Sequence, residues 1–102
     1  MNQAQILAQV RKMQADMAKA QDEIAATVVT GTAAGGTVTV EMTADHALKS
    51  IKIAKEAVDP DDVEMLEDLI VVAVNDASAK AQEFASRKMG ALTGGMKIPG
   101  LT

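Results

Sequence analysis

The residues with the clearest chemical potential are basic side chains that gather in two parts of the chain. They are Arg11, Lys12 and Lys19 near the N-terminus, and Lys80, Arg87 and Lys88 toward the C-terminus. Lysine and arginine bind phosphate oxygens through charge-assisted hydrogen bonds, so these clusters can hold a polyanion, although basic residues spaced among acids and glutamines are also typical of a solvated helix face. The acidic residues concentrate elsewhere, because residues 55–76 hold eight acidic and one basic side chain. Physiological salt screens charges beyond about 8 Å, so acids at that separation leave phosphate binding possible.

Other chemistries find little support in the sequence. The single histidine, His46, has no second histidine or cysteine beside it, and the chain contains no cysteine at all. The acidic run Asp59, Asp61, Asp62 and Glu64 lacks the alternating ligands and central glycine of a calcium loop, and it suits the start of a helix. No nucleophile, base and oxyanion donor can be assembled. We therefore expect no enzyme activity, no metal, no cofactor and no small-molecule substrate.

The composition bounds the class of protein. The chain has 102 residues, a net charge of −4, 48% apolar residues and one aromatic residue, Phe84. This predicts one small domain, residues 1–89, with an aliphatic core that a partner subunit would help to complete. The N-terminus does not resemble a signal peptide and no apolar run is long enough for a membrane span. We expect a cytoplasmic protein without a membrane partner.

A heptad pattern runs through the first segment. Apolar residues follow one another at spacings of four and three residues, at Ile6, Val10, Met13, Met17, Ala20 and Ile24. The pattern predicts a helix over residues 3–26 that packs along one narrow edge. At 1.5 Å per residue such a helix is longer than the body of a compact chain of this size, so part of it should project.

Three strands are expected to follow, over residues 27–31, 37–43 and 48–54. Thr27 to Thr30 is β-branched throughout and ends at Gly31, whereas Val38, Val40 and Met42 alternate with polar residues. The Gly35–Gly36 pair predicts a hairpin turn, and the short connections between the strands favour an antiparallel meander. The alternation predicts one buried and one solvated sheet face.

A second long helix is predicted over residues 60–89. Asp59 is placed to cap it, Pro60 suits its first position, and Gly90 follows its last residue. Its centre is apolar all round, which a single sheet cannot cover, so we expect a homodimer. The interface residues predicted from this stretch are Leu69, Ile70, Val72, Ala73 and Val74. The glycine-rich segment 90–102 is expected to be a flexible tail.

The sequence resembles the YbaB/EbfC family of nucleoid-associated proteins, small bacterial homodimers that bind DNA. The resemblance rests on four short sequence motifs that together span nearly the whole chain. They are Arg11 to Gln14 with Met17, Val29 to Gly31, Glu64 to Leu69 with Asn75 to Ala77, and Gly94 to Met96 with Pro99 and Gly100.

The resemblance implies an α+β fold with the order helix, three-stranded antiparallel sheet, helix, in an intertwined homodimer with protruding helices. It also implies duplex DNA as the partner and a nucleoid location, with DNA contacts at Arg11, Lys12 and Lys19 and a second group at Lys80, Arg87 and Lys88. No recognition helix is visible, so little base readout is expected. The heptad seam alone would equally support an adaptor that captures a partner protein.

Overall fold

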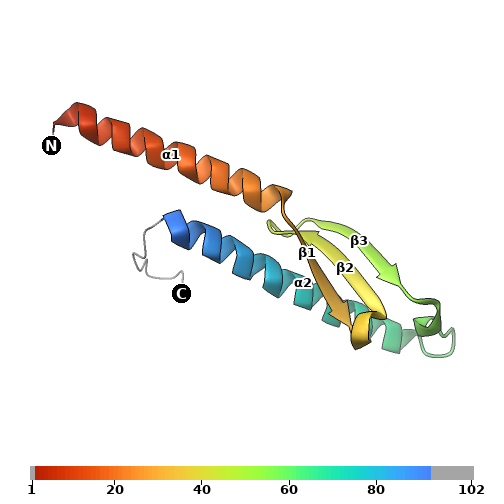
Figure 1. Cartoon of the computed structure of the whole chain (residues 1–102). Coiled ribbons are helices and arrows are strands. Elements are labelled where there is room, and N and C mark those ends of the chain that lie inside the picture. Colours follow the sequence, from red (N-terminus) through yellow and green to blue (C-terminus); the bar gives the residue numbers. More distant parts are fainter. Residues whose placement is uncertain (1, 93–102) are drawn as a thin grey trace.

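The computed structural model describes residues 2–92. In chain order the elements are the helix α1 (Gln3–Ala26), the strands β1 (Val28–Ala33), β2 (Val38–Thr43) and β3 (Leu48–Ile53), and the helix α2 (Val63–Leu92), with short 3₁₀ turns at Ala34–Gly36 and Lys55–Ala57 (Figure 1). The fold is therefore α+β, as predicted, with two long helices and one three-stranded antiparallel sheet in the order β1-β2-β3.

The molecule is strongly elongated. Its principal extents are 71, 24 and 17 Å and its radius of gyration is 19.2 Å, whereas a compact chain of this length would have about 13 Å. The two long helices account for the length, because α2 extends past the sheet and α1 runs beside it and beyond its end, away from the sheet (Figure 1). The projecting helix predicted from its length is thus confirmed.

Local hydrogen bonds set both ends of α1. At its start the Asn2 side chain accepts a hydrogen bond from the Gln5 backbone N–H at 2.8 Å. At its end the Thr27 hydroxyl and backbone N–H both donate to the Glu23 carbonyl, at 2.6 and 3.0 Å. Thr27 therefore ends the helix, and the first strand begins one residue later than predicted.

One face of the sheet carries the core. Val38 and Val40 of β2 have no exposed surface and Met42 is buried, as the alternation predicted. In the antiparallel register Val40 of β2 is paired with Gly31 of β1 on one side and with Ile51 of β3 on the other. Residues paired across antiparallel strands share a face, so this inner face combines all three strands.

Helix α2 lies against the inner face over β1 and β2 through its smallest side chains. Ala73, Ala77 and Ala81 recur every four residues, and all three are fully buried. A Cβ atom placed at Gly31 would overlap the Ala73 carbonyl oxygen and the Ala77 backbone nitrogen. The prediction that Gly31 ends the first strand is wrong: β1 continues to Ala33, and glycine is required because the helix passes so close to the strand.

The other predicted boundaries shift by one to three residues. Thr37 precedes β2 because its hydroxyl donates to the Ala34 carbonyl at 2.7 Å and holds it in the hairpin turn. β3 ends at Ile53 rather than at residue 54. Helix α2 starts at Val63 rather than at residue 60. The Asp59 side chain accepts a hydrogen bond from the Asp61 backbone N–H within a turn. Asp62 caps the helix instead, because its side chain accepts a hydrogen bond from the Met65 backbone N–H at 3.2 Å.

The C-terminal end of α2 also differs from the prediction. The helix does not end before Gly90 but continues to Leu92, so the first three residues of the predicted flexible tail are helical. A single glycine costs a helix about 1 kcal/mol relative to alanine, which flanking helical residues can offset. The remainder of the predicted tail lies outside the described residues.

An apolar surface remains open beside β3. Leu48, Ile51 and Ile53 belong to the inner face by their pairing, yet each is between 38% and 52% exposed because α2 covers the other two strands. On α2 itself Val71 is 57% exposed. The chain by itself thus leaves part of its apolar sheet face and one flank of its central helix in contact with solvent.

Candidate nucleic-acid interface

The cations of α1 lie on its exposed, projecting part. Arg11, Lys12 and Lys19 are all exposed. Lys12 and Lys19 are seven residues apart and so share one flank of the helix, whereas Arg11 lies about 100° further round. None of the three lies on the heptad seam. Their long side chains can therefore reach a ligand without disturbing the helix packing.

One ion pair joins α1 to α2. The Nζ atom of Lys88 lies 2.6 Å from Glu23 Oε2, and it also lies 5.9 Å from the centre of the Phe84 ring. The hydrogen bond from Lys88, with the charges of Lys88 and Lys19, lowers the pKa of the Glu23 carboxyl. This pair connects the base of the projecting helix to the C-terminal half of α2 and places Lys19 and Lys88 beside the same carboxylate.

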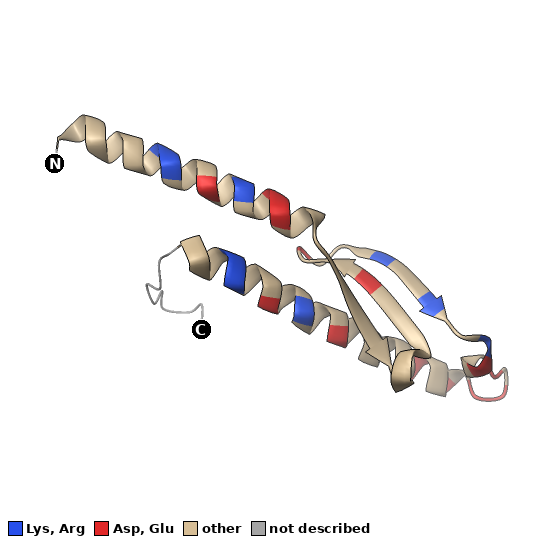
Figure 2. Cartoon of the chain, viewed as in Figure 1, with Lys and Arg blue, Asp and Glu red and all other residues tan. Residues whose placement is uncertain are grey.

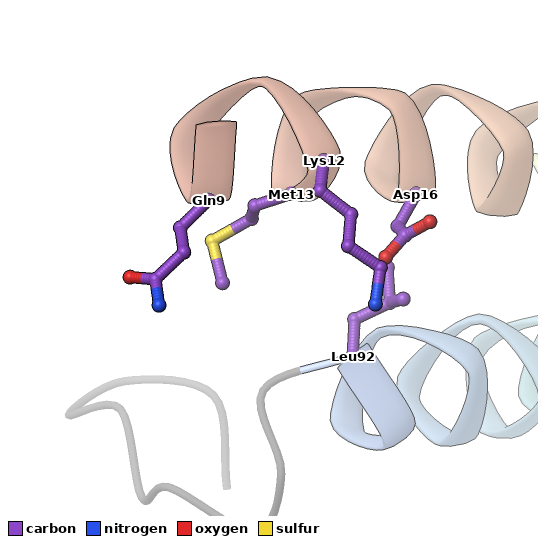
Figure 3. A pocket seen from close by; sticks show the side chains of 5 residues that line it. All are labelled: Gln9, Lys12, Met13, Asp16 and Leu92. Carbon is purple, nitrogen blue, oxygen red and sulfur yellow. The ribbon is translucent and has the colours of Figure 1, made fainter. Parts of the chain in front are cut away.

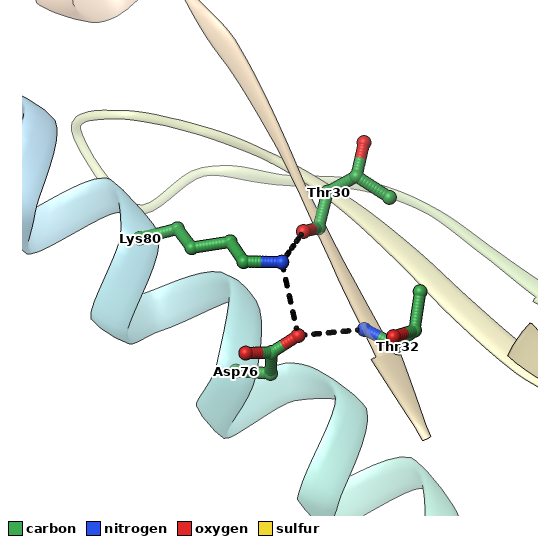
Figure 4. A network of polar contacts seen from close by, with 4 residues as sticks. All are labelled: Thr30, Thr32, Asp76 and Lys80. Carbon is green, nitrogen blue, oxygen red and sulfur yellow. Dashed lines mark hydrogen bonds and ion pairs between the residues drawn. The ribbon is translucent and has the colours of Figure 1, made fainter. Parts of the chain in front are cut away.

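Lys80, predicted as a DNA contact, is engaged within the chain. Its Nζ donates to the Thr30 carbonyl at 2.9 Å and lies 3.2 Å from Asp76 Oδ2. The same carboxylate oxygen accepts the Thr32 backbone N–H at 2.9 Å (Figure 4). These two donors, Thr32 first and then Lys80, lower the pKa of Asp76. Lys80 thus joins α2 to the backbone of β1.

A small cleft separates α1 from the end of α2. It has a volume of about 190 Å³ and is lined by Gln9, Lys12, Met13, Asp16 and Leu92. In Figure 3 the four side chains of α1 extend from the side of the helix that faces α2, and Lys12 and Asp16 end nearest to Leu92. Lys12 therefore lies on the flank of α1 that faces α2, beside the acidic Asp16. The cleft is far narrower than a duplex, so a polyanion can contact only its rim.

Charge is separated along the length of the molecule. The projecting helix carries three of the six predicted cations, and Arg87 and Lys88 lie on the part of α2 that runs beside it (Figure 2). Arg87 is 72% exposed and only loosely paired with Glu83, at 3.9 Å. The acidic excess of residues 56–68 lies at the opposite end, around the start of α2. With a long dimension of 71 Å, the two regions are many screening lengths apart.

Some residues important to this arrangement were absent from the predictions. Glu23 and Asp76 organise the cations around them, but Glu23 and Lys88 are far apart in the sequence and no local pattern joins them. Asp76 and Lys80 are spaced i and i+4, a helix pairing that the sequence does contain. Lys49 and Lys52 add two exposed cations on β3.

The predicted dimer residues divide into three kinds. Leu69, Ile70 and Val74 are half-buried against the core, and Val72 is 53% exposed. Ala73 has no exposed surface in the single chain, so a second subunit could not cover it further. The most exposed apolar side chain of this stretch is instead Val71, which the prediction omitted.

Two further findings concern the described residues only. No helix between residues 2 and 92 combines the length and apolar character needed to cross a membrane. Within the same range no three acidic or histidine side chains converge as a metal site would require.

Comparison with known proteins places these features in a family. Residues 1–96 match the model of the YbaB/EbfC DNA-binding family. A nucleoid-associated protein of Chloroflexus aurantiacus is 55% identical over 97 residues, which cover 95% of this chain and 97% of the relative. A nucleoid-associated protein of Roseiflexus sp. (strain RS-1) is also 55% identical, over 98% of this chain and 99% of the relative.

A solved structure shares the fold. The crystal structure of an uncharacterized protein, HP0035, from Helicobacter pylori superposes with a TM-score of 0.72 over 91% of this chain and 96% of that one. The two sequences are 22% identical, so this likeness concerns the fold alone. It supports the arrangement of two long helices around a three-stranded sheet.

Proposed function

Because the chain belongs to the YbaB/EbfC DNA-binding family, we propose that it binds duplex DNA of the nucleoid as a homodimer through phosphate contacts. The contacts come from Arg11, Lys12 and Lys19 of α1 in both subunits, with the exposed Arg87 of α2 as a further contact. Lys80 and Lys88 are left out because their charges are engaged within the chain, Lys80 by Asp76 and the Thr30 carbonyl and Lys88 by Glu23. Binding of this kind carries little base specificity.

The separation of charge along the molecule carries this proposal. A chain with a net charge of −4 would be repelled by DNA if its charges were evenly spread. Here the acidic excess at the start of α2 lies beyond screening distance from the projecting helix, so the local field at α1 is set by its own three cations and three acids, Asp16, Asp22 and Glu23, and by the cations at the end of α2. The projection of α1 also leaves room for a duplex to approach it.

The homodimer is supported by the open apolar surface beside β3. Leu48, Ile51 and Ile53 are exposed on the face that elsewhere holds the core, and Val71 lies exposed on α2. A second copy that covers this surface would remove the apolar residues from water and complete the sheet face. It would also present two projecting helices to one duplex.

The DNA contacts can be tested by anisotropy with several unrelated duplexes over a range of salt concentrations. Two copies of the three α1 cations offer at most six phosphate contacts, and with about four to six engaged they should contribute about −4 to −5 to the slope of log affinity against log salt. Replacing Arg11, Lys12 and Lys19 by alanine should flatten the slope and weaken every duplex about equally.

A matched control removes the same charge from another part of the molecule. Replacing Lys49, Lys52 and Lys55 by alanine lowers the net charge equally but leaves α1 unchanged. This variant should keep most of the wild-type slope. If both triple variants lose affinity equally, net charge rather than α1 explains binding, and if neither does, the α1 contacts are wrong.

The homodimer can be tested with two neighbouring residues of β3. Ile51 lies on the open inner face, whereas Ser50 lies on the outer face, where its hydroxyl donates to Glu41. Ile51→Lys should convert the dimer to monomers in sedimentation at micromolar concentration, because it places a charge in the apolar interface. Ser50→Lys should remain dimeric. A folded wild-type monomer under these conditions would contradict the proposed interface.

The salt titration also separates this function from the adaptor hypothesis. An adaptor would use the exposed heptad seam of α1 and hold a partner helix by apolar packing, which depends little on salt. Steep salt dependence on unrelated duplexes is expected only for phosphate binding.

A further inference from the structure

The heptad seam of α1 is divided into a covered and an open part. Ala20 and Ile24 are buried against the rest of the chain. The four seam residues before them, Ile6, Val10, Met13 and Met17, are between 38% and 53% exposed. The open part spans about 18 Å, or more than three helical turns. Exposed apolar residues in a regular row are characteristic of a helix that packs against another helix.

The residues beside the open seam favour an identical partner. The positions that flank it are occupied by Leu7 and Gln14 on one side and by Gln9 and Asp16 on the other. With one acid and no lysine or arginine, these flanks contain little that would repel a second copy. The cations Arg11, Lys12 and Lys19 lie outside both the seam and its flanks, so the seam stays open while they hold phosphate.

We propose that the open seam pairs with the same seam of another copy, antiparallel, and so joins one dimer to the next. In this arrangement Ile6 packs opposite Met17, and Val10 packs opposite Met13, so all four residues find partners in both chains. Gln9 and Asp16 line the cleft toward α2 of their own chain, so this flank brings no like-charge pair together. An antiparallel pair also keeps the two sheet domains at opposite ends, where they cannot collide.

The short length of the seam sets its strength. Four apolar layers are fewer than isolated helices need for stable pairing in water. The contact should therefore be weak between free molecules and should form when many dimers are held on the same DNA, where local concentrations reach the millimolar range. Its use on DNA rests on the proposed function, but the seam contact itself does not.

Cysteine cross-linking can test both the contact and its direction, because the natural chain contains no cysteine. Single variants Val10→Cys and Met13→Cys are mixed on a long duplex and oxidised mildly. The mixture should cross-link several-fold more than either variant alone, since residue 10 of one copy faces residue 13 of the other. Ala15→Cys, on the face away from the seam, serves as control and should cross-link at background level.

The mass of the product identifies which molecules are joined. Sedimentation without reductant should show assemblies of four chains or more. Equal cross-linking of all variants, or products confined to two chains, would overturn the proposal. Repeating the cross-linking at submillimolar protein concentration without DNA tests the seam contact separately from the proposed function. If DNA binding fails but the mixed cross-link still forms, the proposed function is wrong and the seam contact stands.

Discussion

The body of the molecule and its projecting helix place their apolar residues differently. In the body, α2 meets the sheet through Gly31 and three alanines, with no space left between helix and strand. In the projecting part of α1, larger side chains such as Val10 and Met13 face solvent. Close packing therefore stabilises the body, whereas the apolar side chains of the projecting helix remain available to contact other molecules.

This difference explains why the cations of α1 can serve binding without affecting folding. Arg11 and Lys12 are exposed on a part of the helix that makes little contact with the body. Lys80, in contrast, bonds to β1 and cannot be removed without altering the contact of α2 with the sheet. The same residue type is structural on the body and available on the projecting helix.

The largest expected effect lies at the closest contact of the body. Gly31→Ala should destabilise the fold by about 3 kcal/mol, because the added carbon overlaps backbone atoms of α2 that cannot rotate away. Thermal unfolding at fixed protein concentration should show a midpoint lowered by about 12 to 20 °C. An unchanged midpoint would mean that α2 can move away from β1 without cost.

A smaller effect on stability should distinguish the buried part of the heptad seam from its exposed part. Ile24→Ala removes a buried side chain and should cost about 2 kcal/mol. Val10→Ala alters the same seam where it is exposed and should change stability by less than about 0.5 kcal/mol. Urea unfolding of both variants measures the difference. Equal losses would show that residue 10 is buried in solution.

The acid dependence of stability should also separate the two regions. The pKa values of Glu23 and Asp76 are lowered in the folded chain, so the folded state binds protons less readily than the unfolded state. The stabilisation is then complete above the ordinary carboxyl pKa and is lost as the pH falls through the lowered values. Melting curves from pH 7 to pH 3 should fall below about pH 4.

Single variants assign that acid dependence to each contact. Asp76→Asn should lower the midpoint at pH 7 and flatten its fall in acid, because the neutral amide has no proton to gain. Glu23→Gln should flatten it too, while changing mainly the attachment of α1 to α2. An unaltered acid profile in both variants would exclude these carboxylates as its source.

The smallest expected effect comes from a second glycine with different surroundings. A Cβ at Gly90 would meet nothing within 4 Å, although the residue lies inside α2. Gly90→Ala should raise stability by about 0.5 kcal/mol through the better helix propensity of alanine. A calorimetric midpoint that rises for Gly90→Ala and falls for Gly31→Ala would confirm that packing, not residue type, separates the two positions.

The local patterns of the sequence predicted the elements well. The heptad spacing placed the first helix over residues 3–26, as observed, and the alternation of Val38, Val40 and Met42 identified the buried face of β2. Both patterns depend on neighbours within one element, where the sequence contains all the information.

Contacts between distant segments could not be read in the same way. Gly31 seemed to be a strand end because its partners, Ala73 and Ala77, are remote in the sequence. For the same reason the apolar stretch of α2 did not reveal that Ala73 faces the sheet while Val71 faces solvent. The six predicted cations were equivalent in the sequence, and only their partners distinguish Lys80 from Arg11.

Asp76 and Lys80 set the register of α2 along β1. The carboxylate accepts a backbone N–H of β1 and the ammonium donates to a backbone carbonyl of β1 (Figure 4). If α2 slipped by one turn, about 5.4 Å, Lys80 or Val72 would replace Asp76 opposite the Thr32 N–H, and neither can accept a hydrogen bond. The pair therefore distinguishes one turn of α2 from the next, which the repeated alanines alone could not do.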